Sequence, residues 1–126
     1  MSRFWIGVGL LLALLGAGLW VMGAMNSVHG AISEDLQQSA SAALAENWAE
    51  ADALARDATA RWEENRPFTS SMADHTELDE IDSIFAQAQV YRAHRSSADY
   101  AACCARLAKL IEALQESHDL NWRNLL

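Results

Sequence analysis

A histidine and several carboxylates lie close together between residues 74 and 82 of this 126-residue chain. His75, Asp79 and Asp82 follow one another at spacings of four and three, so on an α-helix one imidazole and two carboxylates share a face. Nitrogen and oxygen donors of these types bind divalent metals, and three protein ligands with an open position are typical of a catalytic or transported ion. The pattern predicts a metal site at these three residues.

A solvated helix face explains the same residues without a metal. Acidic side chains are favoured near a helix N-terminus, and a carboxylate one turn further on can hold the histidine. His118 and Asn121 lie in the apolar stripe of the last predicted helix, where polar residues usually bond to one another and fix helix register. A meeting of His75 with His118 would favour metal binding, and the sequence leaves this open.

Other reactive residue types lack the spacing that catalysis needs. Cys103 and Cys104 are adjacent and point about 100° apart on a helix, so we expect small core residues rather than a disulfide between them. No glycine follows Gly30, which excludes a glycine-rich phosphate loop from the rest of the chain. No nucleophile has a base at a recognisable spacing. We therefore expect neither enzyme activity nor a cofactor.

The charged residues divide the chain into two parts. Residues 4–33 carry no charge, whereas residues 34–126 hold all 17 acidic residues and 8 of the 9 basic ones. This acidic excess excludes a nucleic-acid binder that works by neutralising phosphates, and it argues against adhesion to anionic lipid.

The uncharged part contains a candidate membrane span. Residues 4–25 have no charged or amide side chain, and at about 1.5 Å per residue they cross a hydrocarbon core of about 30 Å. Trp5 and Trp20 lie near the two ends, where indoles prefer the interface. The stretch exceeds the apolar region of a cleaved signal peptide, and no A-x-A motif follows, which favours an uncleaved anchor. Arg3 and the positive-inside rule predict an N-terminus in the cytoplasm and the remainder outside.

Gly9, Gly16 and Gly23 recur every seven residues in this segment and so share a helix face. Small residues at helical spacing let a second membrane helix approach closely. The face predicts a membrane-protein partner or a homodimer. Glycine is also frequent in membrane helices in general, which is the alternative explanation.

The remaining residues favour helix almost throughout, with one proline and abundant alanine, leucine, glutamate and arginine. We predict an all-α fold, in which an N-terminal transmembrane helix continues into an antiparallel extracytoplasmic bundle of three to four helices. Residues 1–26 are the predicted transmembrane anchor, and residues 27–126 are the predicted extracytoplasmic domain.

Helix ends and buried faces follow from local patterns. Asn47 is the expected cap of the second helix, Ser96 or Ser97 caps the last one, and Pro67 marks a turn between the second and third. Apolar residues at spacings of three and four predict the buried stripes. These stripes are Val28, Ile32, Leu36, Ala40, Ala43 and Leu44; Trp48, Ala51, Ala55, Ala58 and Trp62; Phe68, Met72, Leu78, Ile81, Ile84, Phe85, Ala88 and Tyr91; and Tyr100, Cys104, Leu107, Ile111, Leu114, His118, Asn121 and Leu125.

Three stretches together resemble a known family: NWAEADALARDATARW with Trp48 and Trp62, ADHTELDEIDSIF with His75, and the closing ESHDLNWRNLL. The chain resembles a family of small bacterial single-pass membrane proteins designated domain of unknown function number four-three-six-three. The resemblance covers nearly the full chain. It implies a membrane-anchored helical protein of Gram-positive-type bacteria without an assigned activity, and it supplies no catalytic residues.

Two functions of different classes remain. The first is a membrane-anchored bundle at the outer face of the bacterial cytoplasmic membrane, which acts by protein–protein interaction through the Gly9, Gly16 and Gly23 face. The alternative is an extracytoplasmic metal or small-ligand sensor that uses the His75, Asp79 and Asp82 face.

Overall fold

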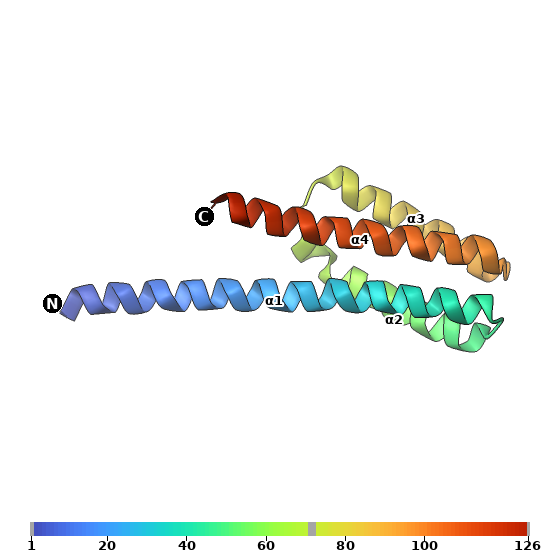
Figure 1. The fold of residues 1–126 in the computed structure, drawn as a ribbon, viewed down its shortest axis with the longest axis horizontal. Helices are drawn as coiled ribbons and strands as arrows, with labels where there is room; N and C mark the ends of the chain where they lie inside the picture. The colour runs from blue at the N-terminus through green and yellow to red at the C-terminus, as the bar shows by residue number, and fades with distance from the viewer. Residues whose placement is uncertain (1, 71–72, 126) are drawn as a thin grey trace.

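The computed structural model describes residues 2–70 and 73–125, except for the side chains of residues 22, 25, 26 and 117–125. This part of the chain forms four α-helices, drawn in Figure 1: α1 (Ser2–Leu44), α2 (Trp48–Ser70), α3 (His75–Ala93) and α4 (Ser97–Leu125). It contains no strand, which confirms the predicted all-α fold class.

α1 is a single helix of 43 residues that belongs to both parts of the molecule. Its N-terminal end extends beyond the other helices, whereas its C-terminal half packs against them (Figure 1). It passes residue 26, the predicted end of the anchor, without a break. Ile32, Leu36 and Ala43 are buried as predicted, but Leu44 is exposed because α1 ends there and the chain turns.

The helices run alternately up and down in the order of the sequence (Figure 1). α1 packs along both α2 and α4, and α3 packs on α4, while α2 and α3 approach each other less closely. The core confirms most of the predicted stripes: Ala51, Ala55, Ala58 and Trp62 of α2; Leu78, Ile81, Ile84, Phe85 and Ala88 of α3; and Tyr100, Cys104, Leu107, Ile111 and Leu114 of α4. The predicted core positions His118, Asn121 and Leu125 lie outside the described side chains.

The turn between α1 and α2 is closed by a hydrogen bond from the Asn47 amide to the Ala42 carbonyl, at 2.8 Å. Glu46, within this turn, has a φ of 60°. It is the left-handed residue that such a helix end requires. Asn47 also caps α2, because its Oδ1 accepts from the Glu50 amide at 3.5 Å and its Nδ2 donates to the Glu50 carboxylate at 3.1 Å. The predicted cap is confirmed.

The turn between α3 and α4 repeats this pattern. The Ser96 amide donates to the Tyr91 carbonyl at 2.9 Å, and Arg95 has a φ of 55°. The Ser96 hydroxyl donates to the Asp99 carboxylate at 2.8 Å in the first turn of α4. Ser96 therefore lies at the start of α4. It is one of the two residues, Ser96 and Ser97, that were predicted to cap this helix.

The predicted turn at Pro67 is wrong, because α2 continues through this proline to Ser70. A proline inside a helix costs about 3 kcal/mol, so packing must hold the segment in place. Thr69, beyond the proline, is fully buried, and its hydroxyl donates to the Asn65 carbonyl at 2.9 Å. The chain turns only after Ser70, and Asp74 then caps α3 by accepting from the Thr76 amide at 3.3 Å.

Phe68 consequently lies in α2, not in the third helix as predicted. It is 45% exposed, so it is not the core residue that the predicted stripe assumed. Met72 lies outside the described residues.

Candidate functional site

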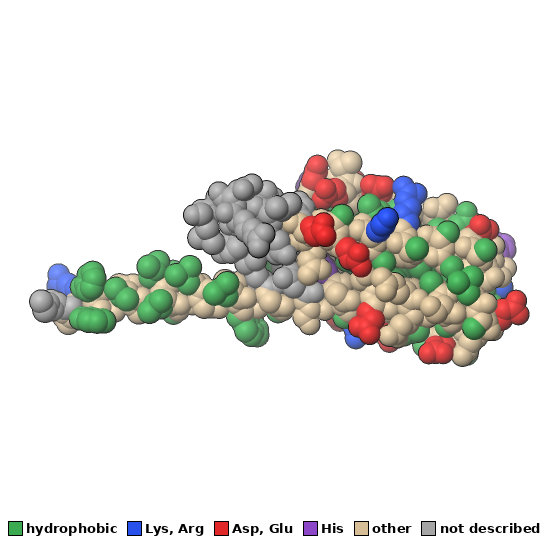
Figure 2. All heavy atoms as spheres, in the orientation of Figure 1, with side chains coloured by type: hydrophobic (Ala, Val, Ile, Leu, Met, Phe, Trp, Pro, Cys, Tyr) green, Lys and Arg blue, Asp and Glu red, His purple; other side chains and the backbone are tan. Residues whose placement is uncertain are grey.

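The N-terminal half of α1 is long and apolar enough to cross a membrane. Ser2–Val21 has a mean hydropathy of 2.1, and none of it is buried. A core helix of a soluble domain would be mostly buried, so this segment does not serve as a core helix of the bundle. Figure 2 shows its hydrophobic side chains projecting along the protruding rod. The large exposed ones are Phe4, Trp5, Ile6, Leu10, Leu11, Leu12, Leu14, Leu15, Leu19 and Trp20. These properties fit a single-pass anchor or a signal sequence.

The predicted glycine face lies on this exposed rod. A Cβ atom added at Gly9, Gly16 or Gly23 would meet nothing within 4 Å, apart from the helix's own backbone. No described part of the chain therefore covers this face. Its role in binding a partner stays a prediction.

The structure separates the three predicted metal ligands by environment. His75 is the first residue of α3 and is exposed. The side chain of Asp79 is 77% exposed and lies 3.8 Å from an Arg66 nitrogen, whereas that of Asp82 is 37% exposed. Asp82 is thus the member of the set that packs against α2.

Asp82 is held by two residues near the end of α2. The Trp62 indole donates to Oδ1 at 2.8 Å, and Arg66 donates to Oδ2 through Nε at 2.8 Å and a terminal nitrogen at 2.6 Å. Burial alone would raise the pKa of Asp82, but the hydrogen bonds from Arg66 and Trp62, together with the Arg66 charge, lower it below its usual value of 3.8. Both carboxylate oxygens therefore already have charged or polar partners.

A metal at the predicted site would have to replace Arg66 at Asp82. Among the residues that the structure describes, no three His, Cys, Asp or Glu side chains are arranged to hold a metal. Metal binding at His75, Asp79 and Asp82 stays a prediction, and His118 lies outside the described side chains. The Arg66 partner was missed from the sequence because it precedes Asp82 by 16 residues, on another helix.

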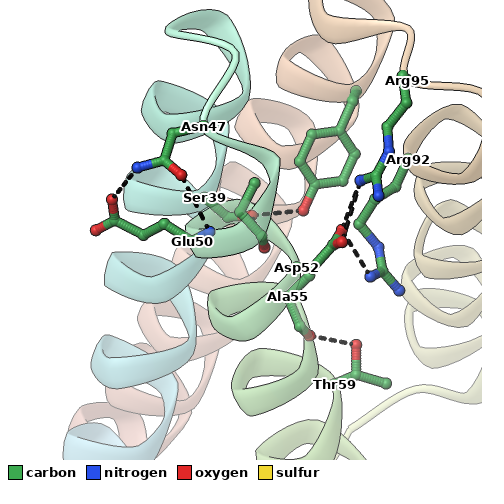
Figure 3. Close-up of polar contacts among 10 residues, drawn as sticks. Ser39, Asn47, Glu50, Asp52, Ala55, Thr59, Arg92 and Arg95 are labelled. Atoms are coloured by element: carbon green, nitrogen blue, oxygen red, sulfur yellow. Dashed lines mark hydrogen bonds and ion pairs between the residues drawn. The ribbon is translucent and has the colours of Figure 1, made fainter.

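A polar cluster at the opposite end of the bundle ties α2 to the turn between α3 and α4 (Figure 3). Arg92 donates to Asp52 at 3.1 Å, and Arg95 donates to both Asp52 oxygens at 3.0 and 3.1 Å. Hydrogen bonding from Arg95 lowers the pKa of Asp52, burial opposes this, and Arg92 adds to the lowering. The Arg95 guanidinium also lies 5.0 Å from the centre of the Trp48 ring, a cation–π contact.

A buried hydroxyl pair lies beside this cluster, where α1, α2 and α4 meet. The Ser39 hydroxyl donates to the Ala51 carbonyl at 2.8 Å and bonds to the Tyr100 hydroxyl at 2.6 Å. Because Ser39 has a single proton and gives it to the carbonyl, Tyr100 is the donor in the second bond. Burial raises the pKa of Tyr100, so it remains protonated. These contacts are structural, because they join α1, α2 and α4.

The two cysteines are buried free thiols, as the sequence predicted for core residues. Burial raises the pKa of Cys104 to about 11, so the thiol is protonated and unreactive at neutral pH. A cavity lined partly by Leu36, Phe85 and Tyr100 has a volume of about 10 Å³, which is the room of one water molecule at most.

No protein with a curated function and no solved structure matches this chain. A family model matches residues 19–125, from the C-terminal end of the apolar segment to the end of α4. The match covers well over half of the chain and agrees with the resemblance drawn from the sequence. The chain belongs to the family described as Domain of unknown function (DUF4363).

Proposed function

We propose that this chain is a single-pass protein of the bacterial cytoplasmic membrane that acts by protein–protein interaction. Its N-terminus lies in the cytoplasm and its bundle lies outside. The partner is another membrane protein or a second copy, docked on the face formed by Gly9, Gly16 and Gly23. The observation that carries the proposal is the apolar N-terminal segment of α1, none of which is buried and which extends from the bundle on the same unbroken helix.

The continuity of α1 supports a role that links the membrane to the exterior. A helix without a break is stiff over its length, so a partner docked on the glycine face would also fix the height and rotation of the bundle outside. Glycines that no described part of the chain covers allow a second helix to approach backbone to backbone, which is how helices associate in lipid.

The bundle itself supports interaction rather than catalysis or small-ligand binding. The cavity beside Tyr100 is too small for a ligand, and the larger hollows, of about 560 and 540 Å³, are open to solvent rather than enclosed. Drug-sized ligands usually need enclosed cavities of several hundred Å³. Asp52 and Asp82 are engaged by arginines.

The anchor can be tested on the full chain in its own bacterium. We expect the protein to stay in the membrane pellet after alkaline carbonate washing, and intact-mass analysis to find residues 4–25 still attached. A shortened chain in the soluble fraction, with its N-terminus beyond residue 25, would identify a cleaved signal sequence and reject the anchor.

The glycine face can be tested with a matched pair of double variants. Gly16→Leu with Gly23→Leu adds two large side chains to the predicted face. Gly7→Leu with Gly18→Leu adds the same side chains about 180° away on the same helix. Tagged full-length chains are purified from native membranes in mild detergent, and a second tagged copy reports self-association.

We expect the first double variant to lose a specific membrane protein, or the second copy, by about tenfold or more, because a close helix contact cannot accept two leucines. The second double variant should retain it. Equal recovery from both variants would reject the glycine face as the docking surface, while the carbonate result would still report on the anchor.

A further inference from the structure

α4 is long enough to reach the level of the apolar half of α1. The two helices run antiparallel and pack along each other, and α4 ends at Leu125 (Figure 1). Two side-chain contacts fix their relative heights. The Ser33 hydroxyl donates to the Glu112 carboxylate at 3.1 Å, and the Ser39 and Tyr100 hydroxyls bond at 2.6 Å.

Helix rise converts these contacts into the height of the end of α4. From Glu112, α4 runs 13 residues to Leu125, about 20 Å, and from Ser33, α1 runs back 12 residues to Val21, about 18 Å. The contact between Tyr100 and Ser39 gives about 37 Å along α4 and about 27 Å along α1. Both contacts place the end of α4 level with Val21 or beyond it, inside the candidate span. Figure 1 shows the same overlap.

The depth of this overlap in a membrane rests on the proposed anchoring. The 20 residues of Ser2–Val21 fill a hydrocarbon core of about 30 Å, and a headgroup layer of about 5–8 Å follows outside it. The last two turns of α4 lie where this layer meets the hydrocarbon core. We infer that the last two turns of α4 enter the outer lipid interface and give the protein a second membrane contact.

The core prevents α4 from withdrawing from the membrane. Leu107, Ile111 and Leu114 of α4 are buried in one cluster with Ile32 and Leu36 of α1. α1 has no break between this cluster and the span, so the bundle cannot tilt away without losing these contacts.

The composition of residues 117–126 suits an interface of zwitterionic lipid. This stretch has one acidic and one basic residue, so it is neutral, in contrast to the acidic remainder of the bundle. It also contains one tryptophan and three leucines. Tryptophan is enriched at membrane interfaces, and apolar residues on a helix strengthen interfacial binding.

Depth-dependent fluorescence quenching tests the inference on the full chain in phosphatidylcholine vesicles. Fluorophores are attached to Asn124→Cys at the end of α4, to Ala102→Cys as the matched position at its start, and to Leu12→Cys in the span. The unmodified chain, whose two cysteines are buried, is the labelling blank. The vesicles carry a spin label either at the headgroup or at carbon 12 of the acyl chain.

We expect the headgroup label to quench the Asn124→Cys probe at least about fivefold more than the Ala102→Cys probe, since contact quenching requires the probe to lie in the interface. The carbon-12 label should quench the Leu12→Cys probe most. Circular dichroism checks each variant, and Asn121→Cys replaces Asn124→Cys if that change lowers the helix content.

Two results would overturn the inference while leaving the anchor intact. One is quenching at Asn124→Cys no stronger than at Ala102→Cys, which places the end of α4 in water. The other is strongest quenching there by the carbon-12 label, which places it in the hydrocarbon core. A Leu12→Cys probe that neither label quenches would instead reject the anchor, and this inference with it.

Discussion

Asp82 provides a sharp test of how α2 is fastened to α3. Asp82→Ala removes the acceptor of the Trp62 indole, whose side chain belongs to the core and is only 3% exposed. A buried donor left without an acceptor costs about 1–3 kcal/mol. The contact with Arg66 is more than a third exposed on both sides, so we count nothing for it. We therefore expect a loss of about 2 kcal/mol in the free energy of unfolding.

Thermal unfolding of the full chain in detergent, followed by near-ultraviolet circular dichroism, measures this loss. For a bundle of about 100 residues, 2 kcal/mol corresponds to a fall in Tm of about 10 °C. Asp79→Ala is the matched control, because Asp79 is 77% exposed and lies 3.8 Å from its arginine. We expect this control to change the free energy of unfolding by less than about 0.5 kcal/mol.

A double-mutant cycle separates the orphaned indole from other effects of the substitution. In a Trp62→Phe background there is no indole N–H to leave unpaired, so Asp82→Ala should cost about 0.5 kcal/mol or less. An undiminished cost in that background would refute the reasoning. So would equal losses from Asp82→Ala and Asp79→Ala in the unmodified chain.

The lowered pKa of Asp82 adds a pH dependence with a definite sign. A carboxyl group whose pKa is lower in the folded state stabilises the fold above its usual pKa of 3.8, and this contribution is lost as the pH falls through the folded value. The stability difference between the unmodified chain and Asp82→Asn should therefore be constant between about pH 5 and pH 8, and it should shrink below about pH 4. A difference that is the same at about pH 3 as at neutral pH would contradict this assignment.

Three further changes test other parts of the structure. Asp52→Ala releases both arginines at the turn between α3 and α4 and should lower the stability by about 1 kcal/mol in the same unfolding assay, while the exposed control Asp57→Ala should leave it unchanged. Ala58→Leu overfills the buried face of α2 and should cost about 1–3 kcal/mol, against little for Ala60→Leu on the exposed face. For the metal hypothesis, elemental analysis of the full chain after dialysis against zinc should find bound metal that His75→Ala removes, and no metal in either protein rejects the site.

The buried faces could be predicted because they depend on local spacing alone. Leu78, Ile81 and Phe85 recur at three and four residues, and this period places them on one side whatever they pack against. The caps at Asn47 and Ser96 were accessible for the same reason, since their partners lie within three residues.

Pro67 shows where a local rule fails. Its effect on the backbone favours a turn, but the burial of Thr69 beyond it and the attachment of Arg66 to α3 hold the helix together. The partners of Asp82 were out of reach because they lie on another helix, and their meeting depends on how both helices are rotated. Only the fold supplies that rotation.

The two hairpins of the bundle repeat each other more closely in burial than in residue type. Glu46 and Arg95, the left-handed residues of the two turns, are 49 positions apart. The same offset relates the following buried pairs: Ile32 and Ile81, Leu36 and Phe85, Ser39 and Ala88, Ala51 and Tyr100, Ala55 and Cys104, Ala58 and Leu107, and Trp62 and Ile111. The equivalence holds for helix ends as well as for core positions.

Packing explains why some of the paired residues differ in size. The alanines of α2 let α1 come close, and Tyr100 of α4 fills the space beside Ala51, where both meet Ser39. At two of these pairs, Ala51 with Tyr100 and Ala58 with Leu107, a small residue in one hairpin corresponds to a large one in the other, because the shared core has a fixed volume. Where packing is complementary in this way, it removes the residue-type similarity by which a repeat is recognised in a sequence, whereas the spacing of the buried positions preserves the repeat.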